Sequence, residues 1–463
     1  MERLYDGKKI LILGLARSGI AAAELLCKNG AQVTLSDRKN LGDFDDSLNR
    51  VIRMGCRAEL GRDVDRELLQ NQDMMIISPG VPIDAPAVKL AREMGVPVIG
   101  EMEAASRLLP CPMIAVTGTN GKTTTVSLLG EIFQASGTNC HVCGNIGYPV
   151  SAAAMECGEE DMVVCEVSSF QLESIETFHP LSAAVLNITE DHLNRHGTME
   201  VYIGLKKHIF ANQSGEDYAV LNADDPITCT IAEGLNGKVL WFSRKREVEN
   251  GAFVRDGKMI LRNDGEECTV CDVKDIYIPG PHNLENALAA ALMAWTRGVD
   301  PKVICRVLKE FKGVEHRIEF VRELDGIRYI NDSKGTNTDS TIKAVEAMTR
   351  PTAIILGGYD KHVSFVPLAK CMKASPYMKH AVLIGVTADQ IERELRQEGF
   401  TAISRAETLK EAVLKCRKSC SEGSNVLFSP SCASFDMFSD YEQRGRVFKQ
   451  IVAELKGKKE DAE

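Results

Sequence analysis

The sequence predicts an α/β protein with mainly parallel sheets, and three observations lead to this prediction. Short apolar runs of strand length alternate with segments of helical periodicity along the whole chain. Many of these runs end in glycine, proline or a polar residue, where a turn or a helix start would follow. The chain has 463 residues, 44% of them apolar, which suffices for two to four domains with buried cores.

The first block, residues 1–100, opens with a β-α-β unit. An apolar run ends in glycine, a segment of helical periodicity (20–30) follows, and a second apolar run ends in an acid. We therefore expect a small N-terminal domain with a parallel sheet. Its strands are expected at 8–14, 31–37, 74–80 and 96–101.

The second block, residues 101–313, opens with a strand, a glycine-rich loop and a long helix over 113–137. The alanine-rich segment 280–298 predicts another helix, because it ends in glycine after a continuous run of helix formers. The further strands of this central domain are expected at 161–169, 182–189, 218–225 and 238–243.

The third block, residues 314–463, repeats the alternation of strand and helix and ends in a charged tail. We therefore expect a C-terminal domain that also has a mainly parallel sheet. Its strands are expected at 327–332, 352–358, 380–385 and 424–430.

Charge and cysteine usage narrow the class of protein. A net charge of −10 without long basic stretches argues against nucleic-acid binding. The sequence contains no run of eighteen apolar residues, so we expect no membrane span. Without a secretory leader, and with fifteen irregularly spaced cysteines, the chain is expected to be cytoplasmic. We also expect a monomer. Two C-x-x-C pairs, Cys140/Cys143 and Cys268/Cys271, leave a structural zinc as a weak alternative.

The glycine stretch from Gly14 to Gly19 resembles a dinucleotide fingerprint. Its middle glycine is replaced by Ala16, and Asp37 ends the next expected strand, where a ribose-binding acid would lie. The loop 78–82 ends another parallel strand and would share a crevice with Gly14. The pattern favours nucleotide binding over a plain turn, and it favours nicotinamide chemistry less, because the fingerprint is imperfect.

The stretch AVTGTNGKTTT, residues 115–125, is the strongest functional signal. Val116 stands where the usual phosphate loop has its first glycine, so this loop is shortened. Backbone N–H groups of such a turn and the following helix N-terminus bind anions. Lys122 would reach the β- and γ-phosphates, and Thr123 would ligate Mg²⁺.

Acidic residues and a histidine follow two expected strands of the same block. Glu166 ends one apolar run, and Glu190, Asp191 and His192 end the next. Oxygen and imidazole ligands suit Mg²⁺ or Mn²⁺. Each group alone is more often a cap or a surface ion pair, but together with the phosphate loop they predict a metal–ATP site. His196 is expected to be a polar loop residue.

Two loops of the third block, 331–337 and 429–445, follow apolar strands and are dense in small polar groups. This density favours ligand binding over plain helix caps. The second loop contains Cys432, so a cysteine nucleophile is a further, weaker alternative.

With these stretches in hand, the chain resembles the Mur ligases, ATP-dependent amide-forming enzymes of bacterial peptidoglycan precursor synthesis. The shortened loop GTNGKTT is typical of these ligases and of folylpolyglutamate synthases, and the resemblance extends over almost all 463 residues. It is strongest to the ligases that add D-glutamate to UDP-N-acetylmuramoyl-L-alanine. The other motifs that carry it are GNIGYP, EVSSFQLE, NITEDHLNRH, LNADD, HNLENALAA, HRIE, INDSKGTN, LGGYDK and SPSCASFDMFSDYEQRG.

The resemblance implies a Rossmann-like N-terminal domain for UDP, a central P-loop ATPase-type domain for ATP and a Rossmann-like C-terminal domain for the amino acid. The residues implied for the UDP-linked substrate are Leu15, Ala16, Asp37, Arg38, Ser78, Gly80, Asn145 and Ser168. Those implied for ATP are Gly118, Thr119, Asn120, Gly121, Lys122, Thr123, Thr124, Asn283, Asn286, Arg317 and Asp332. Those implied for D-glutamate are Lys334, Thr336, Lys361, Ser434, Phe435 and Tyr441.

The resemblance also implies the metal ligands and the chemistry. Two Mg²⁺ or Mn²⁺ ions would be held by Thr123, Glu166, His192 and Lys206, the last as a carbamate formed with CO₂. Lys207 is a competitor for that assignment. The catalytic residues would be Lys122, Glu166, His192 and Lys206. The reaction would pass through an acyl phosphate and a tetrahedral intermediate and release ADP and phosphate.

Three rival functions remain open at this point. A folylpolyglutamate synthase would share the loop but lack the domain that precedes it. A nicotinamide-dependent oxidoreductase is suggested by the first glycine stretch, and Ala16 and the separate ATP loop count against it. A non-catalytic nucleotide-binding regulator would not need the lysine and acid constellation.

Overall fold

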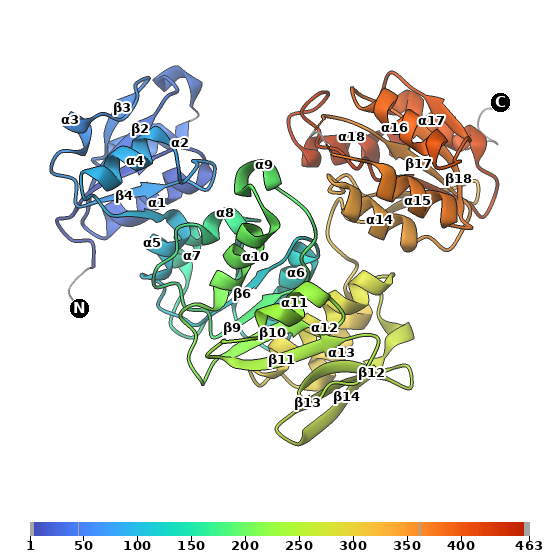
Figure 1. Cartoon of the computed structure of the whole chain (residues 1–463), viewed down its shortest axis with the longest axis horizontal. Coiled ribbons are helices and arrows are strands. Elements are labelled where there is room, and N and C mark those ends of the chain that lie inside the picture. The colour runs from blue at the N-terminus through green and yellow to red at the C-terminus, as the bar shows by residue number, and fades with distance from the viewer. Residues whose placement is uncertain (1–3, 45, 361–362, 458–463) are drawn as a thin grey trace. The chain divides into compact units, whose positions relative to one another are not determined.

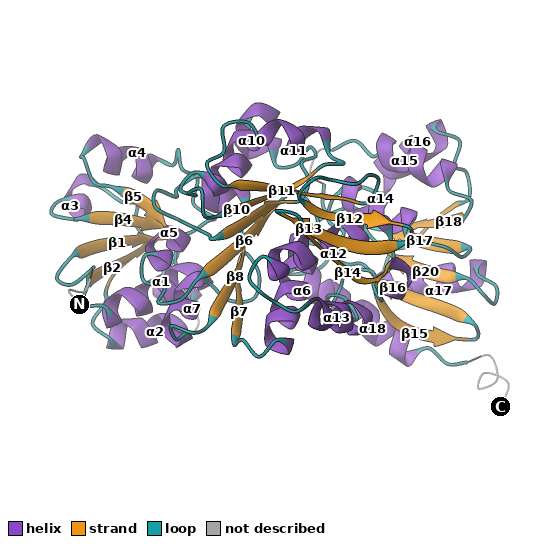
Figure 2. Cartoon of the chain, turned by 90° about the horizontal axis from the view of Figure 1, so that it is seen from below, coloured by secondary structure: helices purple, strands orange, loops and turns teal. Residues whose placement is uncertain are grey.

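The computed structural model describes residues 4–44, 46–360 and 363–457, in which three sheets are covered by helices (Figure 2). The chain groups into two compact units. The first contains the chain up to Ile276 together with Glu285–Glu310, and the second contains Tyr277–Leu284 together with the chain from Phe311 onward.

The first sheet has five parallel strands in the order β3-β2-β1-β4-β5. The strand order reverses at β1, so the carboxyl ends of β1 and β4 open a crevice between neighbouring loops. Apolar cores lie on both faces, as the buried run Ile10–Ile12 requires. The strands are β1 (Lys9–Leu13), β2 (Gln32–Asp37), β3 (Arg57–Leu60), β4 (Met74–Ile77) and β5 (Val98–Gly100). The helices are α1 (Arg17–Lys28), η1 (Leu41–Asp43), α2 (Asp46–Arg53), α3 (Arg66–Leu69), α4 (Pro86–Glu93) and α5 (Glu101–Ser106).

The second sheet has nine strands in the order β14-β13-β12-β11-β10-β9-β6-β8-β7, and its parallel part runs from β12 to β7. The strands β12 to β14 add an antiparallel extension at one edge (Figure 1). The strands are β6 (Met113–Thr117), β7 (Cys140–Gly144), β8 (Met162–Glu166), β9 (Ser182–Val185), β10 (Tyr218–Asn222), β11 (Lys238–Ser243), β12 (Gly251–Arg255), β13 (Lys258–Asn263) and β14 (Glu266–Asp272). The helices are α6 (Lys122–Ala135), α7 (Val150–Glu156), α8 (Ser169–Leu172), α9 (Leu193–His196), α10 (Met199–Lys207), η2 (His208–Phe210), α11 (Pro226–Ile231), η3 (Val273–Asp275), α12 (Pro281–Trp295) and α13 (Pro301–Glu310).

The third sheet has six strands in the order β15-β16-β20-β17-β18-β19, and only β15 is antiparallel to its neighbour. Apolar clusters again cover both faces. The strands are β15 (Glu319–Leu324), β16 (Ile327–Asn331), β17 (Thr352–Leu356), β18 (Met378–Leu383), β19 (Ile403–Arg405) and β20 (Asn425–Phe428). The helices are α14 (Thr338–Glu346), α15 (Val366–Ala374), α16 (Ala388–Gln397), α17 (Leu409–Ser419) and α18 (Tyr441–Glu454).

The predicted α/β class with mainly parallel sheets is confirmed, and each expected strand forms. The sequence analysis missed β3, β7, β12 to β15 and β19. The division into domains at 1–100, 101–313 and 314–463 stays a prediction. Within the described ranges, no helix combines the length and the apolar character needed to cross a membrane.

Candidate active site

The glycine-rich loop joins β6 to α6 in the parallel part of the second sheet. Gly121 caps the helix with φ 87°, and a Cβ added there would lie 2.2 Å from Oδ1 of Asn286. Gly118 has φ 145°, with Cβ of Leu186 only 3.1 Å from the corresponding position. The loop therefore needs both glycines, and it presents backbone N–H groups at the start of α6, as an anion site does.

Side chains from the loop after β9 and from α10 hold the loop in place. The N–H of Asn120 donates to Oδ1 of Asn187 at 2.9 Å, and Nδ2 of Asn187 donates to the Asn120 carbonyl at 3.0 Å. The hydroxyl of Thr119 contacts that of Tyr202 at 3.2 Å. The sequence analysis missed Asn187 and Tyr202. The expected strand 182–189 included Asn187, but β9 ends at Val185, so Asn187 lies on the loop that follows.

Glu166, itself a predicted metal ligand, contacts Thr123 of the phosphate loop and Asn145, which is implied for the UDP-linked substrate. It ends β8 with only 2% of its surface exposed, and its two oxygens accept hydrogen bonds from Thr123 and Asn145, each at 2.8 Å. Both donors are neutral, so these bonds do not balance the carboxylate charge. A buried carboxylate beside a hydroxyl at a phosphate loop is a donor set that fits Mg²⁺ or Mn²⁺.

Two lysines point to the same loop. Nζ of Lys122 donates to the carbonyls of Gly118 and Thr119, each at 2.8 Å, and Nζ of Lys206 donates to Gly118 at 2.9 Å. Lys206 is buried, and its ammonium lies 4.6 Å from the Tyr202 ring centroid. Burial, and secondarily the charge of Lys122, hold the pKa of Lys206 well below its usual range.

His192 and α9 lie beside α8, which follows Glu166. His192 has left-handed backbone with φ 54°, and its ring centroid is 4.9 Å from that of Phe170. His196 is not the polar loop residue that the sequence suggested. Its buried ring bonds the Ser169 hydroxyl at 2.9 Å and stacks on Tyr202, and burial lowers its pKa. This packing couples the segment after His192 to the segment after Glu166.

A cavity of about 650 Å³ opens at the carboxyl ends of the first sheet. Of the residues implied for the UDP-linked substrate, Asp37, Arg38 and Gly80 line it. Oδ2 of Asp37 also accepts from the Leu15 N–H at 2.8 Å. The lining residues that the sequence analysis did not predict include Arg62, Asp63 and Asp84.

The remaining residues implied for that substrate lie on loops of the first unit. The Ser78 hydroxyl donates to the Gly14 carbonyl at 2.6 Å, which ties the two crevice loops together. Ala16 caps α1. Ser168 caps α8, and its side chain accepts from the N–H of Gln171.

In the second unit, Asp332 is buried at the end of β16. Its oxygens accept from the Ser429 hydroxyl at 2.6 Å and from the Ile318 N–H at 3.2 Å. Burial raises the pKa of Asp332 to about 6, although Arg317 lowers it. Asn283, also implied for ATP, donates to the Pro279 carbonyl at 2.7 Å.

Of the residues implied for D-glutamate, Lys334 and Thr336 lie on the loop after β16, Ser434 and Phe435 lie on the loop after β20, and Tyr441 begins α18. Nζ of Lys334 lies 5.3 Å from the ring centroid of Tyr441. Ser434 is buried, whereas Phe435 is 68% exposed and lies edge-on to Tyr359. The N–H of Thr336 bonds the Lys334 carbonyl at 2.9 Å. Lys361 lies outside the described residues.

The cysteine alternatives find no support. The thiol of Cys432 is buried, and burial raises its pKa to about 11, so it is not a thiolate at neutral pH. Cys140 and Cys143 lie three residues apart in β7, and such side chains point to opposite faces of a strand. Within the described ranges, no group of three or more His, Cys, Asp or Glu side chains could hold a metal ion by itself.

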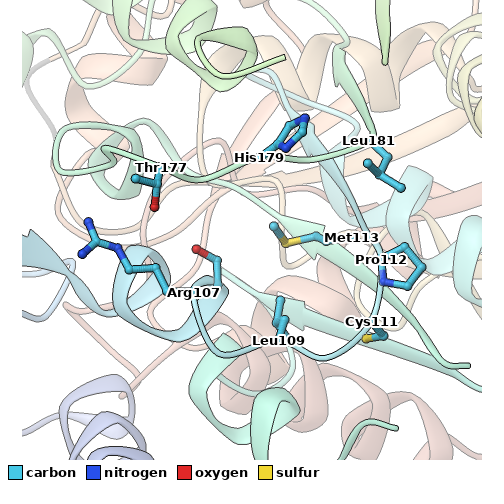
Figure 3. A pocket seen from close by; sticks show the side chains of 9 residues that line it. Arg107, Leu109, Cys111, Pro112, Met113, Thr177, His179 and Leu181 are labelled. Atoms are coloured by element: carbon cyan, nitrogen blue, oxygen red, sulfur yellow. The ribbon is translucent and has the colours of Figure 1, made fainter. Parts of the chain in front are cut away.

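A smaller cavity of about 220 Å³ lies at the amino end of β6. Figure 3 shows that one wall comes from Thr177, His179 and Leu181 and the other from the segment that enters β6. Arg107 is paired with Glu103 and Glu176, and His179 bonds Asp217 at 2.7 Å. The two basic side chains that line this cavity are thus each paired with acids outside it.

A phosphate loop with a buried carboxylate and a buried lysine beside it, on a parallel sheet, is the arrangement of an enzyme that activates a substrate with a nucleoside triphosphate. Comparison with models of protein families narrows this class of enzyme to one family. The Mur ligase middle domain matches residues 116–294, the Mur ligase MurD-like N-terminal domain matches 8–100, and the Mur ligase glutamate ligase domain matches 316–432. The chain belongs to the Mur ligase family.

Similar proteins extend over nearly the whole chain. A UDP-N-acetylmuramoylalanine--D-glutamate ligase of Thermoanaerobacter sp. (strain X514) is 46% identical over 97% of this chain and 99% of its own length. The ligase of the same name from Clostridioides difficile (strain 630) is 45% identical over 97% and 99%.

Solved structures share the fold at lower identity. A MurF structure from Acinetobacter baumannii has a TM-score of 0.62 at 19% identity and covers 90% of each chain. A pseudomurein peptide ligase type C from Methanothermus fervidus has a TM-score of 0.60 at 20% identity, over 97% of this chain and 100% of its own.

Proposed function

We propose that this chain is an ATP-dependent ligase that joins D-glutamate to UDP-N-acetylmuramoyl-L-alanine in peptidoglycan precursor synthesis. One observation carries the proposal: the phosphate loop that bears Lys122 meets a buried carboxylate, Glu166, through Thr123. The names of the 46% and 45% identical relatives support the choice of substrates. We also propose that the ligase is a cytoplasmic monomer.

The donor set around the loop fits two divalent ions. Thr123 and Glu166 would hold the first Mg²⁺ or Mn²⁺, and His192 with a carbamylated Lys206 would hold the second. When bound, these ions supply positive charge that offsets the repulsion between a carboxylate and the ATP phosphates. Lys122 adds a further positive charge at the loop.

The geometry of Lys206 supports its carbamylation. A neutral amine is the form that attacks CO₂, and the lowered pKa of Lys206 favours that form. Lys207 instead donates to the Glu233 carbonyl at 2.7 Å and is partly exposed. The structure thus supports Lys206 over its neighbour for this role. A carbamate would turn the buried amine into an oxygen ligand beside the loop.

The proposed reaction has two steps that balance in atoms and charge. A carboxylate oxygen of the UDP-linked substrate attacks the γ-phosphorus, and the bond to ADP breaks as an acyl phosphate forms. The deprotonated amine of D-glutamate then attacks the acyl carbon. The tetrahedral intermediate expels phosphate and leaves the amide, and the amine protons pass to solvent. The backbone N–H groups of the loop and Lys122 orient the γ-phosphate for the first step.

Each substrate is assigned to the loops that the resemblance implies. The cavity lined by Asp37, Arg38 and Gly80 would take the UDP group, because it is large and lies at the reversal of strand order. In the first unit, the phosphate loop and Asn286 would bind the ATP phosphates. The family resemblance also implies ATP contacts for Asn283, Arg317 and Asp332 of the second unit. Lys334, Thr336, Lys361, Ser434, Phe435 and Tyr441 would bind D-glutamate.

A phosphate-release assay tests the function. With ATP, Mg²⁺ and UDP-N-acetylmuramoyl-L-alanine, we expect release with D-glutamate and little with L-glutamate, meso-diaminopimelate or L-lysine. Lys122→Ala should abolish turnover while circular dichroism shows an intact fold, and Lys89→Ala on an exposed helix should not. Release that is equal with all four amino acids, or that does not need the UDP-linked substrate, would contradict the proposal.

Chemical rescue tests the carbamate separately. Lys206→Ala should lose activity, and added short carboxylates should partly restore it by occupying the place of the carbamate. Lys207→Ala is the matched control, because it removes the same charge one residue away. Restoration of Lys207→Ala but not of Lys206→Ala would move the role to the neighbour.

A further inference from the structure

Arg444 is a buried cation to which the sequence analysis gave no role. It lies in the first turns of α18, and only 1% of its surface is exposed. Such burial of a guanidinium is unusual, because removing it from water is costly unless every donor finds an acceptor. The acceptors of this side chain therefore indicate what it does.

The guanidinium of Arg444 bonds four neutral oxygens. Nη2 donates to the Ser333 carbonyl at 2.7 Å, and Nε donates to the Ser333 hydroxyl at 3.1 Å. Nη1 donates to the carbonyls of Cys432 and Ala433, each at 3.1 Å. None of these four acceptors is a carboxylate. Burial lowers the pKa of Arg444 to about 10, and at this pKa the side chain is still cationic at neutral pH.

These acceptors belong to loops at the carboxyl ends of adjacent strands. Ser333 follows β16, and Cys432 and Ala433 follow β20. A third loop, after β17, joins them, because the N–H of Tyr359 donates to the Ala433 carbonyl at 2.9 Å. The Ser333 hydroxyl donates in turn to the Tyr441 carbonyl at 2.8 Å, which closes the network on α18 itself.

Close packing also holds the loop after β17 against Ala433 and Arg444. Gly358 has φ 155°, and a Cβ there would lie 2.5 Å from the Ala433 carbonyl oxygen and 3.3 Å from Nη1 of Arg444. The loop after β17 can therefore approach this closely only as glycine. Arg444 thus joins the loops after β16 and β20 directly, and the loop after β17 is joined to them through Ala433. The first two of these loops bear Lys334, Thr336, Ser434 and Phe435, which are proposed to bind the amino acid.

We infer that Arg444 is a positioning and specificity-determining residue for the amino-acid substrate. It holds the three loops in register and places a fixed positive charge behind them, which favours a substrate with two carboxylates. The inference rests on the proposed function for the identity of that substrate. Arg444 acts through the loops, and Lys334 and Ser434 are the groups that would touch the ligand.

Steady-state kinetics with three variants test the inference. Arg444→Met removes both charge and hydrogen bonds, and Arg444→Lys keeps the charge but loses the planar fork. Arg446→Met is the matched control, since it removes the same charge from an exposed position of the same helix. We expect KM for D-glutamate to rise about tenfold or more in Arg444→Met and less in Arg444→Lys, with KM for the UDP-linked substrate within about threefold.

The inference is overturned if Arg444→Met folds and has the wild-type KM for D-glutamate. If Arg444→Met does not fold, a wild-type KM for D-glutamate in Arg444→Lys overturns it instead. It is also overturned if KM for the UDP-linked substrate rises by the same factor as KM for D-glutamate, as a merely structural role would cause. Arg446→Met should match the wild type in every constant.

Amide hydrogen exchange gives a readout that does not need the substrate. In Arg444→Lys, segments 332–336, 357–360 and 430–436 should exchange faster than in Arg446→Met, and equal exchange would overturn the positioning role. If the wild type releases no phosphate with D-glutamate, the proposed function fails, while this measurement still decides whether Arg444 orders the loops.

Discussion

Lys122 and Lys206 donate to one and the same carbonyl oxygen, that of Gly118, at 2.8 and 2.9 Å. Two ammonium groups on one acceptor repel each other, and Lys206 is buried as well, so its neutral form is favoured. The burial of Lys206 and the nearby charge of Lys122 therefore both favour the neutral amine, the form that the proposed carbamylation would need.

The first prediction concerns the stability cost of Lys206. Its folded-state pKa lies below the ordinary value of 10.5, so between these values the unfolded chain binds more protons and stability rises with pH. Lys206→Met should therefore raise Tm at pH 7 in CO₂-free, metal-free buffer, and the gain should shrink toward pH 10. Thermal unfolding followed by circular dichroism measures this. A gain that does not change with pH, or that Lys207→Met reproduces, would contradict the prediction.

The second prediction concerns Gly121. Alanine at φ 87° costs about 1–2 kcal/mol in backbone strain, and its Cβ would displace the side chain of Asn286. Gly121→Ala should weaken ATP binding about tenfold or more, measured by calorimetry with Mg²⁺. Gly137→Ala is the control, because it has φ 92° with nothing within 4 Å. It should lose similar stability and keep its ATP affinity, and equal ATP affinities in the two variants would refute the role of the clash.

The third prediction contrasts two buried glutamates of α5. Burial raises the pKa of Glu101, and only its Oε1 is bonded, by the N–H and hydroxyl of Ser151. Burial also acts on Glu103, but hydrogen bonds, first from Thr177, lower its pKa below the ordinary value. Burial thus shifts the pKa of Glu101 toward the neutral acid, whereas hydrogen bonds shift that of Glu103 toward the charged form.

Amide substitution separates these two cases. Glu103→Gln should destabilise the protein by about 2–3 kcal/mol at pH 7, because a charged acceptor is lost. Its stabilising contribution is present above the unfolded-state pKa near 4.5 and disappears as pH falls through the lower folded-state value. Glu101→Gln should be nearly neutral, and its relative stability should improve as pH rises above 4.5. Urea unfolding at pH 4 and pH 7 checks both, and an equal loss in the two variants would contradict the assignment.

The fourth prediction concerns Asp332, whose pKa is raised to about 6. Between 3.8 and 6 the folded state binds more protons than the unfolded chain, so the contribution of Asp332 to stability falls as pH rises through this window. Asp332→Asn should therefore be more stable than the wild type at pH 8, by about 1–3 kcal/mol, and not at pH 4. Urea unfolding measures the difference. Glu216→Gln, which changes a carboxylate that is 91% exposed, should show no such dependence.

The parts of the fold that the sequence predicted share one property. Strands such as β1 and β6 are buried on both faces, so their residues form continuous apolar runs. The missed strands lie at or near sheet edges. β3 reads Arg-Ala-Glu-Leu, and β14 has exposed glutamates, so neither has a run to recognise. β14 pairs with the preceding strand β13 and β3 with the preceding strand β2, so what these strands lack is an apolar run and not a nearby partner.

The candidate site also contains residues that the local sequence predicts and residues that it does not. The phosphate loop was predictable from local sequence, because its glycines, lysine and helix start are contiguous. Lys206 was named only through the family resemblance, since a lysine on a helix is ordinarily exposed and nothing local indicates its burial. Arg444 and His196 were missed for the same reason, because their partners lie on other elements.

The antiparallel extension of the second sheet has a consequence for the aggregation of the protein at high concentration. Its outermost strand, β14, begins with the exposed Glu266 and Glu267, and the latter is paired with Arg255 and Arg262 on the two strands inside it. A foreign strand that docked along this border would have to strip water from those carboxylates. The longest sheet of the chain is therefore protected from growing into fibres at that border.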